Sequence, residues 1–400
     1  MHGRLAVKML RIRVRGMAPT KGLSIGSSQT RCQHIGSYSP RISVVDSSGY
    51  KLNQMRLWLT LLFLPAMAYS TGSYTAEKMT DHGVDVIGLT DAAHGVSVSI
   101  APSLGNRAFE LKVHGKNLLY FPVPDIARFR DSGAKQLNGI PFLAPWANRM
   151  AEGGFWANDK WYRFNPDLGT VHVGSDGIAI HGMLTSSPLW EVIDVGADGR
   201  SAHVTSRLQF WKYPDLMANW PFAHEYEMTY TLSNGILEVS TKVINLSAKP
   251  MPVVLGFHPY FKLPDVPRSE ASVHVPAHKH VETDAHLVAT GELRRVKLPN
   301  WVSLKDYAFD DGYTDLTRAS DGRAIFSVKA GSKKIEVLYG GRYQVAVIYA
   351  PRNQPFICFE PMTAITNGAN LAHFGKYEEL QTVAPGSTWQ ESFWVRPGGF

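Results

Sequence analysis

Short runs in which apolar and polar residues alternate recur along most of the chain after about residue 75. Val96, Val98 and Ile100 alternate with polar residues, and the segment from Phe109 to Val113 follows the same pattern. This period of two is typical of strands with one buried face. No long segment shows the apolar stripe of an amphipathic helix. The pattern therefore predicts an all-β protein.

Two pairs of alternating runs predict β-hairpins. The first joins residues 226–232 to residues 237–243 through Ser233-Asn234-Gly235. The second joins residues 335–339 to residues 345–349 through Gly340-Gly341. Asn-Gly and Gly-Gly pairs readily adopt the positive φ angles that a tight hairpin turn needs.

The chain shows no boundary between domains after residue 75. Its 24 prolines and 35 glycines are spread along the sequence, as expected for many turns between short strands. A repeat of fixed length is absent from the sequence, which disfavours a propeller or a solenoid. We predict one large antiparallel β domain over residues 75–400.

Composition excludes several classes of protein. With 44% hydrophobic and 19% charged residues, the chain can bury a sizeable core, so it is neither disordered nor a mini-protein. Cys32 and Cys358 give neither the spacing of a zinc finger nor a disulfide framework.

The formal net charge of +7 comes from the first 68 residues. That stretch has one acid, Asp46, whereas residues 69–400 carry 31 basic and 33 acidic side chains. A broad phosphate-binding surface gives a domain a clear positive excess, so we predict no nucleic-acid partner. The ten basic residues of the stretch are Arg4, Lys8, Arg11, Arg13, Arg15, Lys21, Arg31, Arg41, Lys51 and Arg56.

Residues 55–68 have the arrangement of a secretory signal peptide. Arg56 precedes an apolar run, residues 57–65, which leads into the small-residue cleavage pattern of residues 66–68. Such a run is too short to cross a bilayer as a helix. We therefore predict export, to the periplasm or the cell's surroundings, and no stable membrane insertion. Residues 1–54 are basic and serine-rich, and we interpret them as sequence upstream of the true start, with a targeting extension as the alternative.

Four segments place polar side chains in apolar, glycine- and proline-rich surroundings. Arg149 ends the segment 142–149, His181 precedes a glycine, His258 lies in Gly-Phe-His-Pro-Tyr-Phe, and Glu360 follows an apolar run. A buried carboxylate costs free energy unless it is paired, hydrogen-bonded or protonated. Glu360 is therefore the acid most expected in a functional site. An ion pair with Arg149 is the structural alternative.

In this order, the segments resemble those of the aldose 1-epimerase (mutarotase) family over about residues 80–400. Each match alone is weak, but five in the right order over a β-rich chain are specific. The matches are Asn148-Arg149 with Gly153-Gly154-Phe155, Ile180-His181-Gly182, His258-Pro259-Tyr260-Phe261, Asp310 in Phe309-Asp310-Asp311, and Glu360-Pro361.

This resemblance implies a galactose mutarotase-like β-supersandwich in a single domain. It further implies that Glu360 removes the proton of the anomeric hydroxyl and that His258 protonates the ring oxygen. The sugar ring then opens, and closure after rotation about C1–C2 gives the other anomer. Arg149, His181, Asp310 and Asn148 would bind the sugar, a free aldohexose such as glucose or galactose. Such proton transfers need no metal and no organic cofactor.

The sequence departs from the family pattern at three places. Ala289 stands where a P-T-G-E segment has its proline, and Phe257 stands where many members have a small polar residue, which leaves the preferred sugar open. Asp311 adjoins Asp310, so either could be the aspartate that binds the sugar. Among the nearby aromatic residues, Trp146, Tyr260 and Trp190 are candidates for stacking on a sugar, with a place in the core as the alternative.

A second constellation has residue types that can bind a divalent metal, but we interpret it as a solvated polar face or a loop before Thr290, with metal binding as the alternative. In a strand, side chains two positions apart share one face but lie about 7 Å apart, so they rarely converge on one ion. The alternating set consists of His278, His280, Glu282, Asp284 and His286.

Two other functions stay open from sequence. One is a glycoside hydrolase or lyase-like enzyme on the same fold that uses Asp310 and Glu360 as paired carboxylates. The other is a sugar-binding module without catalysis. The sequence leaves the oligomeric state open.

Overall fold

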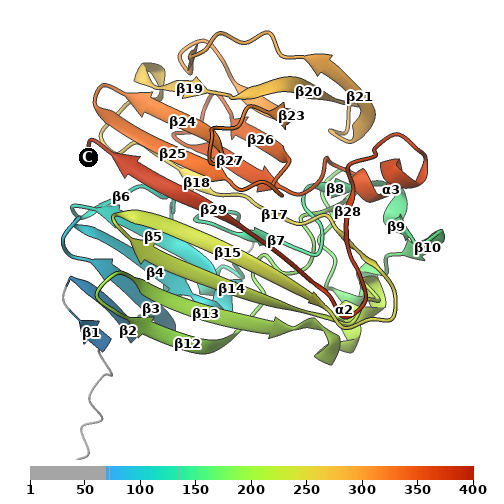
Figure 1. Ribbon diagram of the computed structural model, residues 1–400, viewed down its shortest axis with the longest axis horizontal. Coiled ribbons are helices and arrows are strands. Elements are labelled where there is room, and N and C mark those ends of the chain that lie inside the picture. Colours follow the sequence, from blue (N-terminus) through green and yellow to red (C-terminus); the bar gives the residue numbers. More distant parts are fainter. Residues whose placement is uncertain (1–68, 72, 135) are drawn as a thin grey trace, which may run out of the picture. The chain divides into compact units, whose positions relative to one another are not determined.

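Antiparallel strands make up most of the described protein. The computed structural model describes residues 69–71, 73–134 and 136–400, all within one structural unit (Figure 1). The predicted extension (1–54) and signal peptide (55–68) lie outside the described residues. In the part described, no helix has the length and apolar character needed to cross a membrane.

Three large sheets contain most of the strands. The six-stranded sheet runs in chain order through β1 (Tyr69–Thr71), β2 (Tyr74–Asp81), β3 (Val84–Asp91), β4 (Val96–Ala101), β5 (Arg107–Val113) and β6 (Lys116–Asn117). The nine-stranded sheet has the order β12 (Glu191–Ala197), β13 (Ala202–Gln209), β14 (His224–Ser233), β15 (Ile236–Asn245), β29 (Thr388–Gly398), β25 (Lys333–Tyr339), β24 (Ala324–Ala330), β19 (Ser272–His274) and β22 (Val302–Ser303). The eight-stranded sheet has the order β21 (Ala289–Arg295), β20 (Ala277–Thr283), β23 (Phe309–Leu316), β26 (Val345–Ala350), β27 (Ile357–Met362), β17 (Gly256–Phe257) and β7 (Phe142–Leu143), with β18 (Tyr260–Phe261) also paired to β27.

The remaining elements are short. Three two-stranded sheets pair β9 (Gly154–Ala157) with β10 (Lys160–Arg163), β8 (Arg149–Met150) with β11 (Ala179–Ile180), and β16 (Met251–Val253) with β28 (Gln381–Val383). The α-helices are α1 (Ile126–Asp131), α2 (Pro214–Asn219) and α3 (Gly368–His373). Single 3₁₀ turns occupy Pro102–Leu104, Ala151–Gly153, Pro166–Leu168, Phe210–Lys212 and Arg268–Glu270.

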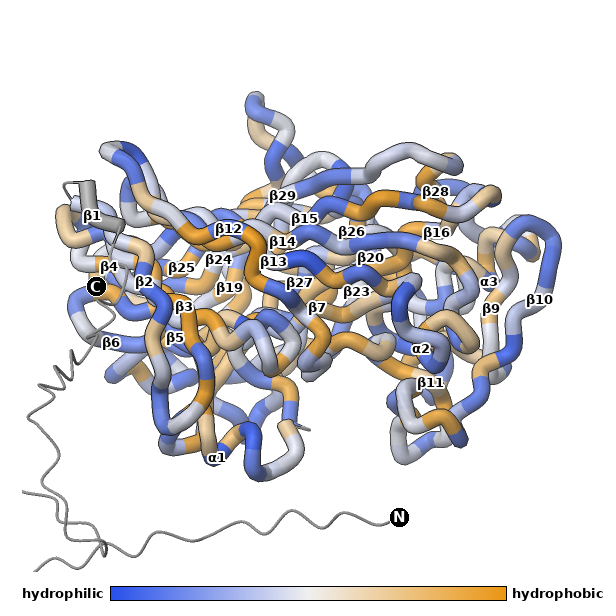
Figure 2. Tube along the Cα trace, turned by 90° about the horizontal axis from the view of Figure 1, so that it is seen from below, coloured by the Kyte–Doolittle hydropathy of each residue, from blue (hydrophilic) through white to orange (hydrophobic). Residues whose placement is uncertain are grey.

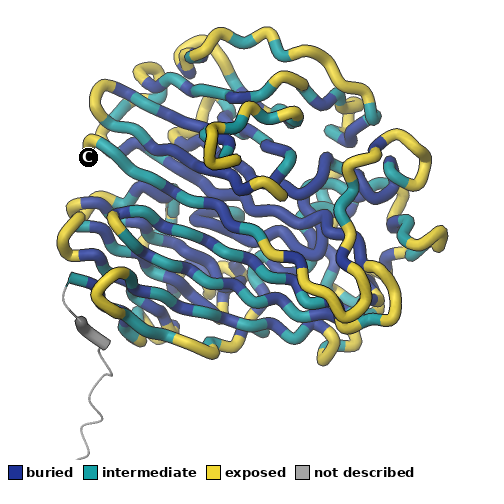
Figure 3. The backbone as a smooth tube through the Cα atoms, in the orientation of Figure 1, coloured by how far each residue is buried: buried dark blue, intermediate teal, exposed yellow. Residues whose placement is uncertain are grey.

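The sheets pack face to face, as the alternating pattern requires. Strands β2 and β3 contact β12 and β13, which joins the six-stranded sheet to the nine-stranded one. The eight-stranded sheet meets the nine-stranded sheet through aromatic pairs, among them Phe257 with Phe393 and Phe326 with Phe359. Hydrophobic segments follow many strands (Figure 2), and exposed segments gather at the connecting loops (Figure 3). The predicted all-β fold is confirmed.

The first predicted hairpin forms with its expected turn. Ser233 of β14 pairs with Ile236 of β15, so Asn234 and Gly235 are the two turn residues, with φ of 50° and 70°. Burial alternates residue by residue along both strands.

The second predicted hairpin is wrong. Strand β25 pairs with β24 and β29 in the nine-stranded sheet, whereas β26 pairs with β23 and β27 in the eight-stranded sheet. The chain between them therefore crosses from one sheet to the other. Gly340 has no left-handed φ there, but a Cβ at Gly340 would overlap the Glu391 carboxylate. The glycine is needed for close approach rather than for a tight hairpin.

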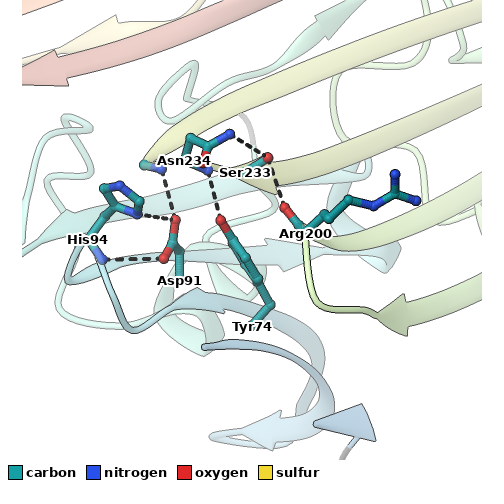
Figure 4. Close-up of polar contacts among 7 residues, drawn as sticks. Tyr74, Asp91, His94, Arg200, Ser233 and Asn234 are labelled. Carbon is teal, nitrogen blue, oxygen red and sulfur yellow. Dashed lines mark hydrogen bonds and ion pairs between the residues drawn. The ribbon is translucent and has the colours of Figure 1, made fainter. Parts of the chain in front are cut away.

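A buried carboxylate ties two of the large sheets together at their turns (Figure 4). Asp91, at the end of β3, accepts hydrogen bonds from the Gly235 backbone N–H at 2.8 Å and faces Nδ1 of His94 at 2.8 Å. The Asn234 backbone N–H donates to the Tyr74 hydroxyl at 3.0 Å. The β14–β15 turn is thus locked onto the six-stranded sheet.

Candidate active site

The register of the eight-stranded sheet places several predicted site residues on one face. Directly opposed residues of antiparallel strands project to the same face. Two adjacent rows cross the sheet on this face: Asp310, Tyr349, Cys358 and Tyr260 form one, and Gly312, Val347 and Glu360 form the other.

Glu360 and His258 meet in the interior of this face. Nε2 of His258 lies 3.3 Å from Oε1 of Glu360, and their side chains are only 8% and 1% exposed. Burial, together with the negative charge of Asp310, raises the pKa of Glu360 well above its usual range. Burial lowers the pKa of His258 to about 3. Both effects favour the neutral forms. Near neutral pH the pair therefore shares one titratable proton, which is on the Glu360 carboxyl while the His258 imidazole is uncharged.

The backbone around His258 fixes its ring. His258 lies between β17 and β18, and its backbone N–H donates to the Pro141 carbonyl at 3.1 Å. The Tyr260 ring stacks on the imidazole with centroids 4.6 Å apart, and its hydroxyl is 3.5 Å from Nε2. The His-Pro-Tyr-Phe segment thus presents Nε2 toward Glu360.

His181 reaches the same point from β11. Its φ of 61° is in the left-handed region, which is uncommon for a residue other than glycine and often marks a functional position. Its backbone N–H donates to the Asn148 carbonyl at 2.9 Å, and its ring lies edge-on to His258 with centroids 5.6 Å apart. Burial, and then the nearby His258, lower the pKa of His181 well below 6.5, so the ring is neutral.

Gly182 permits the chain after His181 to approach the backbone at Ala144 closely. Gly182 has a φ of 67°, and a Cβ there would overlap the Ala144 carbonyl. Met183 N–H donates to that same carbonyl at 2.8 Å. Only glycine fits both the conformation and the space.

Asn148, Arg149 and Asp310 line a cleft next to this pair. Val347 also lines the cleft and is the cross-strand partner of Glu360, so the cleft adjoins Glu360. Burial raises the pKa of Asp310, and Arg149 opposes that shift. The cleft lining consists of Asn148, Arg149, Val281, Thr283, Leu287, Asp310, Asp311, Gly312, Val345, Val347, Ile365 and Thr366.

Arg149 makes an ion pair that the sequence did not predict. Its Nε lies 3.2 Å from Oδ2 of Asp176, and the alternative pair of Arg149 with Glu360 is not formed. Oδ1 of Asp176 accepts from the Ile178 N–H at 3.1 Å, which shapes the turn before β11. These hydrogen bonds lower the pKa of Asp176, the Ile178 N–H having the largest effect.

The two adjacent aspartates point to opposite faces of β23. Asp310 shares its face with Tyr349 and Glu360. Asp311 also borders the cleft, but its Oδ1 lies 2.9 Å from Nε2 of His280. Asp310 is thus the aspartate that lies on the same face as Glu360.

The aromatic candidates for sugar stacking are mostly core residues. Trp146 is fully buried and stacks on Phe164 with centroids 4.5 Å apart. Trp190 is 6% exposed and packs against Phe142. Tyr260 lies at the site but its ring covers His258. The suggestion that Trp146 stacks on a sugar is therefore wrong, because no face of it is accessible.

The alternating histidines and acids of residues 278–286 do not converge on one point. Strand β20 ends at Thr283, so Asp284 and His286 leave the strand, and Asp284 accepts from the His286 N–H in a turn. His280 instead lies between Glu282 and Asp311. Among the described residues, the one group of His, Cys, Asp or Glu with ligand atoms near enough for a metal is His258, Cys358 and Glu360.

Three residues near the site had no functional signal in the sequence. Tyr349 and Cys358 are cross-strand neighbours on the site face, visible only once β26 is paired with β27. Asp176 belongs to a polar turn that resembles any surface loop. For Tyr349, the predicted alternation of residues 345–349 was the available signal, but it does not specify a partner strand.

Comparison with known proteins gives a family and a fold. The family model described as aldose 1-epimerase matches residues 85–396. A galactose mutarotase-like protein from Clostridium acetobutylicum has 22% identity and a TM-score of 0.73, covering 82% of this chain and 100% of its own. Galactose 1-epimerase from Lactobacillus acidophilus has 15% identity and a TM-score of 0.62, covering 82% of this chain and 99% of its own. A protein described as a putative aldose 1-epimerase from Escherichia coli has 17% identity and a TM-score of 0.56, covering 76% of this chain and 96% of its own. At these identities the structures establish the galactose mutarotase-like fold.

Proposed function

The chain belongs to the aldose 1-epimerase family, and from this we propose that it is an isomerase that interconverts the α and β anomers of free aldohexoses such as glucose or galactose. The observation that carries the proposal is the buried contact between His258 and Glu360 beside a polar cleft. Ring opening takes one proton from O1 and gives one to O5, so it requires a base and an acid within reach of the same small ring.

The proposed reaction uses the single proton of the pair. Transfer of that proton across the 3.3 Å contact gives a carboxylate on Glu360 and an imidazolium on His258. Glu360 then takes the O1 proton while His258 protonates O5, and the C1–O5 bond breaks. Rotation about C1–C2 and the reverse proton transfers close the ring as the other anomer. Each positioned proton transfer is typically worth about 10²–10⁴-fold in rate.

The cleft residues have binding roles in this proposal. Arg149 and the neutral His181 hold the side of the ring oxygen, and Asn148 contacts a neighbouring hydroxyl. Asp310 accepts hydrogen bonds from hydroxyls remote from C1. Arg149 is the one cation among the described residues lining the cleft, and Asp176 neutralises it in part, which favours an unphosphorylated sugar.

Polarimetry tests the proposal. Freshly dissolved α-D-glucose and α-D-galactose are followed with the wild-type protein and with Glu360→Gln. We expect the wild type to accelerate the change in optical rotation. The rate with the variant should be close to the rate in buffer alone. If neither protein exceeds buffer while both bind sugar, the chain is a binding module instead.

A hydrolase that pairs Asp310 with Glu360 is the second enzyme class to test. The partner of Glu360 at hydrogen-bonding distance is a histidine, which ring opening uses and a two-carboxylate hydrolase does not require. Release of new reducing ends from oligosaccharides would favour the hydrolase.

We also propose that the protein is exported after cleavage behind Ala68. The support is the basic, apolar and small-residue succession of residues 55–68. Mass spectrometry of the protein isolated from its natural source tests this, because export predicts a chain that begins at Tyr69.

A further inference from the structure

Cys358 is a ligand-type side chain at the site that ring opening does not use. It lies two residues before Glu360 on β27, so both side chains are on the same face of the strand. Cys358 is fully buried. One ligand atom each from Cys358, Glu360 and His258 lies within 4.8 Å of the others.

These three groups form a recognised donor set for a soft divalent cation. Zinc binds thiolate, imidazole and carboxylate, and sites with three protein ligands keep one position open for water or another molecule. The spacing of the atoms suits convergence on one ion, since the nitrogen and oxygen of His258 and Glu360 are already 3.3 Å apart.

A second observation also points to a ligand at this place. Oε2 of Glu360 is buried without a hydrogen-bond partner in the described protein. Buried polar atoms usually have a partner, so this carboxylate oxygen is available to a group that enters the site. A sugar hydroxyl satisfies it during catalysis, and a cation would satisfy it in the absence of sugar.

We propose that His258, Cys358 and Glu360 form an inhibitory site for Zn²⁺ or a similar soft divalent cation, with its open coordination position toward the sugar cleft. The cation occupies the Nε2 lone pair and the carboxylate that the proposed proton transfers need. Cation and sugar therefore exclude each other. The inhibitory part rests on the proposed isomerase function, whereas cation binding can be measured without it.

Cobalt provides a readout that is independent of activity. Chelator-stripped full-length protein is titrated with Co²⁺, and we expect a thiolate-to-cobalt charge-transfer absorption at one equivalent. Cys358→Ser should lose this absorption. Cys32→Ser is the matched control, because it removes the other cysteine of the chain, and it should retain the absorption. Absence of the band in the wild type, or its persistence in Cys358→Ser, overturns the site.

Zinc inhibition of mutarotation tests the functional part. We expect Zn²⁺ to inhibit the wild type, a chelator to restore the rate, and added sugar to raise the apparent inhibition constant. Loss of a direct ligand should weaken inhibition at least about 10-fold in Cys358→Ser, since even outer-shell changes cost 10–100-fold in metal affinity. Equal zinc sensitivity of the two proteins, or faster mutarotation with zinc, overturns the inhibition.

The two proposals fail in different ways. A cobalt band without mutarotation supports the cation site and contradicts the proposed isomerase activity. Mutarotation without a cobalt band supports the isomerase activity and contradicts the cation site. If thermal melting shows that Cys358→Ser is unfolded, Cys358→Ala gives the same comparison without a buried hydroxyl.

Discussion

Nε2 of His258 lies 3.3 Å from Oε1 of Glu360, and the two side chains are almost completely shielded from solvent. At this separation in a low-dielectric setting, the protonation of one residue depends on that of the other. The pair should therefore behave as one unit toward both mutation and pH.

The first prediction is that substitutions at His258 and Glu360 have non-additive effects. Glu360→Gln and His258→Gln should each lower kcat by about 10²–10⁴-fold, because each removes one positioned proton transfer. The double variant should be little worse than the worse single variant, since residues that act together are not additive. Initial rates from polarimetry measure all three. A double variant whose loss is the product of the two single losses would show that the residues act independently.

The second prediction is the pH dependence of kcat/KM. Burial lowers the pKa of His258 to about 3, so a second proton enters the pair only well below the ordinary imidazole pKa of 6.5. The single proton leaves as pH rises through the raised pKa of Glu360. We expect a bell-shaped profile with its acid limb far below 6.5. Rates are measured by polarimetry after subtraction of the buffer-catalysed reaction, and an acid limb at 6.5 would contradict the burial argument.

The third prediction separates Asp310 from Asp311. Asp310→Asn should lower kcat/KM by about 10- to 100-fold, because a hydrogen bond to a charged group contributes strongly to binding. Asp311→Asn is the matched control on the next residue. Its carboxylate faces His280, so its kcat/KM should stay close to wild type. The assignment is wrong if the two variants exchange these results.

Local sequence predicted the elements whose partners are neighbours in the chain. The β14–β15 hairpin has a two-residue turn, and Asn234 and Gly235 supply its positive φ angles. Gly340 and Gly341 carry an equally strong hairpin signal, yet β25 and β26 belong to different sheets. Pairing between distant strands depends on packing of whole sheet faces, which no local pattern records.

The same distinction between local signals and long-range contacts applies to the residues of the candidate site. Glu360 and His258 could be identified as candidates because a carboxylate or imidazole inside an apolar segment is conspicuous, and the family resemblance implied a role for each. Asp176 could not, because a polar turn with glycine and serine is typical of any exposed loop. Cys358 resembles a core residue in sequence, and its nearness to Glu360 and His258 follows only from the strand register.

The fourth prediction tests Asp176 as a positioning residue for Arg149. Asp176→Asn keeps an oxygen that can accept the Ile178 N–H but removes the charge that holds the guanidinium. We expect KM to rise about two- to five-fold with kcat nearly unchanged, the range for a partly exposed ion pair.

A matched substitution elsewhere controls for the change in turn chemistry. Asp198 also accepts backbone N–H bonds in a turn, from Arg200 and Ser201, but it lies between β12 and β13. Asp198→Asn should leave KM unchanged. A fall in kcat with constant KM in Asp176→Asn would indicate a role in the proton transfers instead.

The fifth prediction concerns acid stability. His224 is fully buried, its Nδ1 is 2.6 Å from the Phe222 carbonyl, and burial lowers its pKa from 6.5 to about 4. The unfolded chain therefore binds a proton at higher pH than the folded one, so His224 favours the folded state above 6.5 and loses this contribution as pH falls toward 4. The difference corresponds to about 3 kcal/mol at 1.36 kcal/mol per pKa unit. Urea unfolding at several pH values measures the free energy of unfolding. This free energy should depend less steeply on pH for His224→Gln than for wild type, whereas the control His286→Gln, at an exposed position, should match wild type. Equal slopes for all three proteins would mean that burial does not lower the pKa of His224 below its value in the unfolded chain.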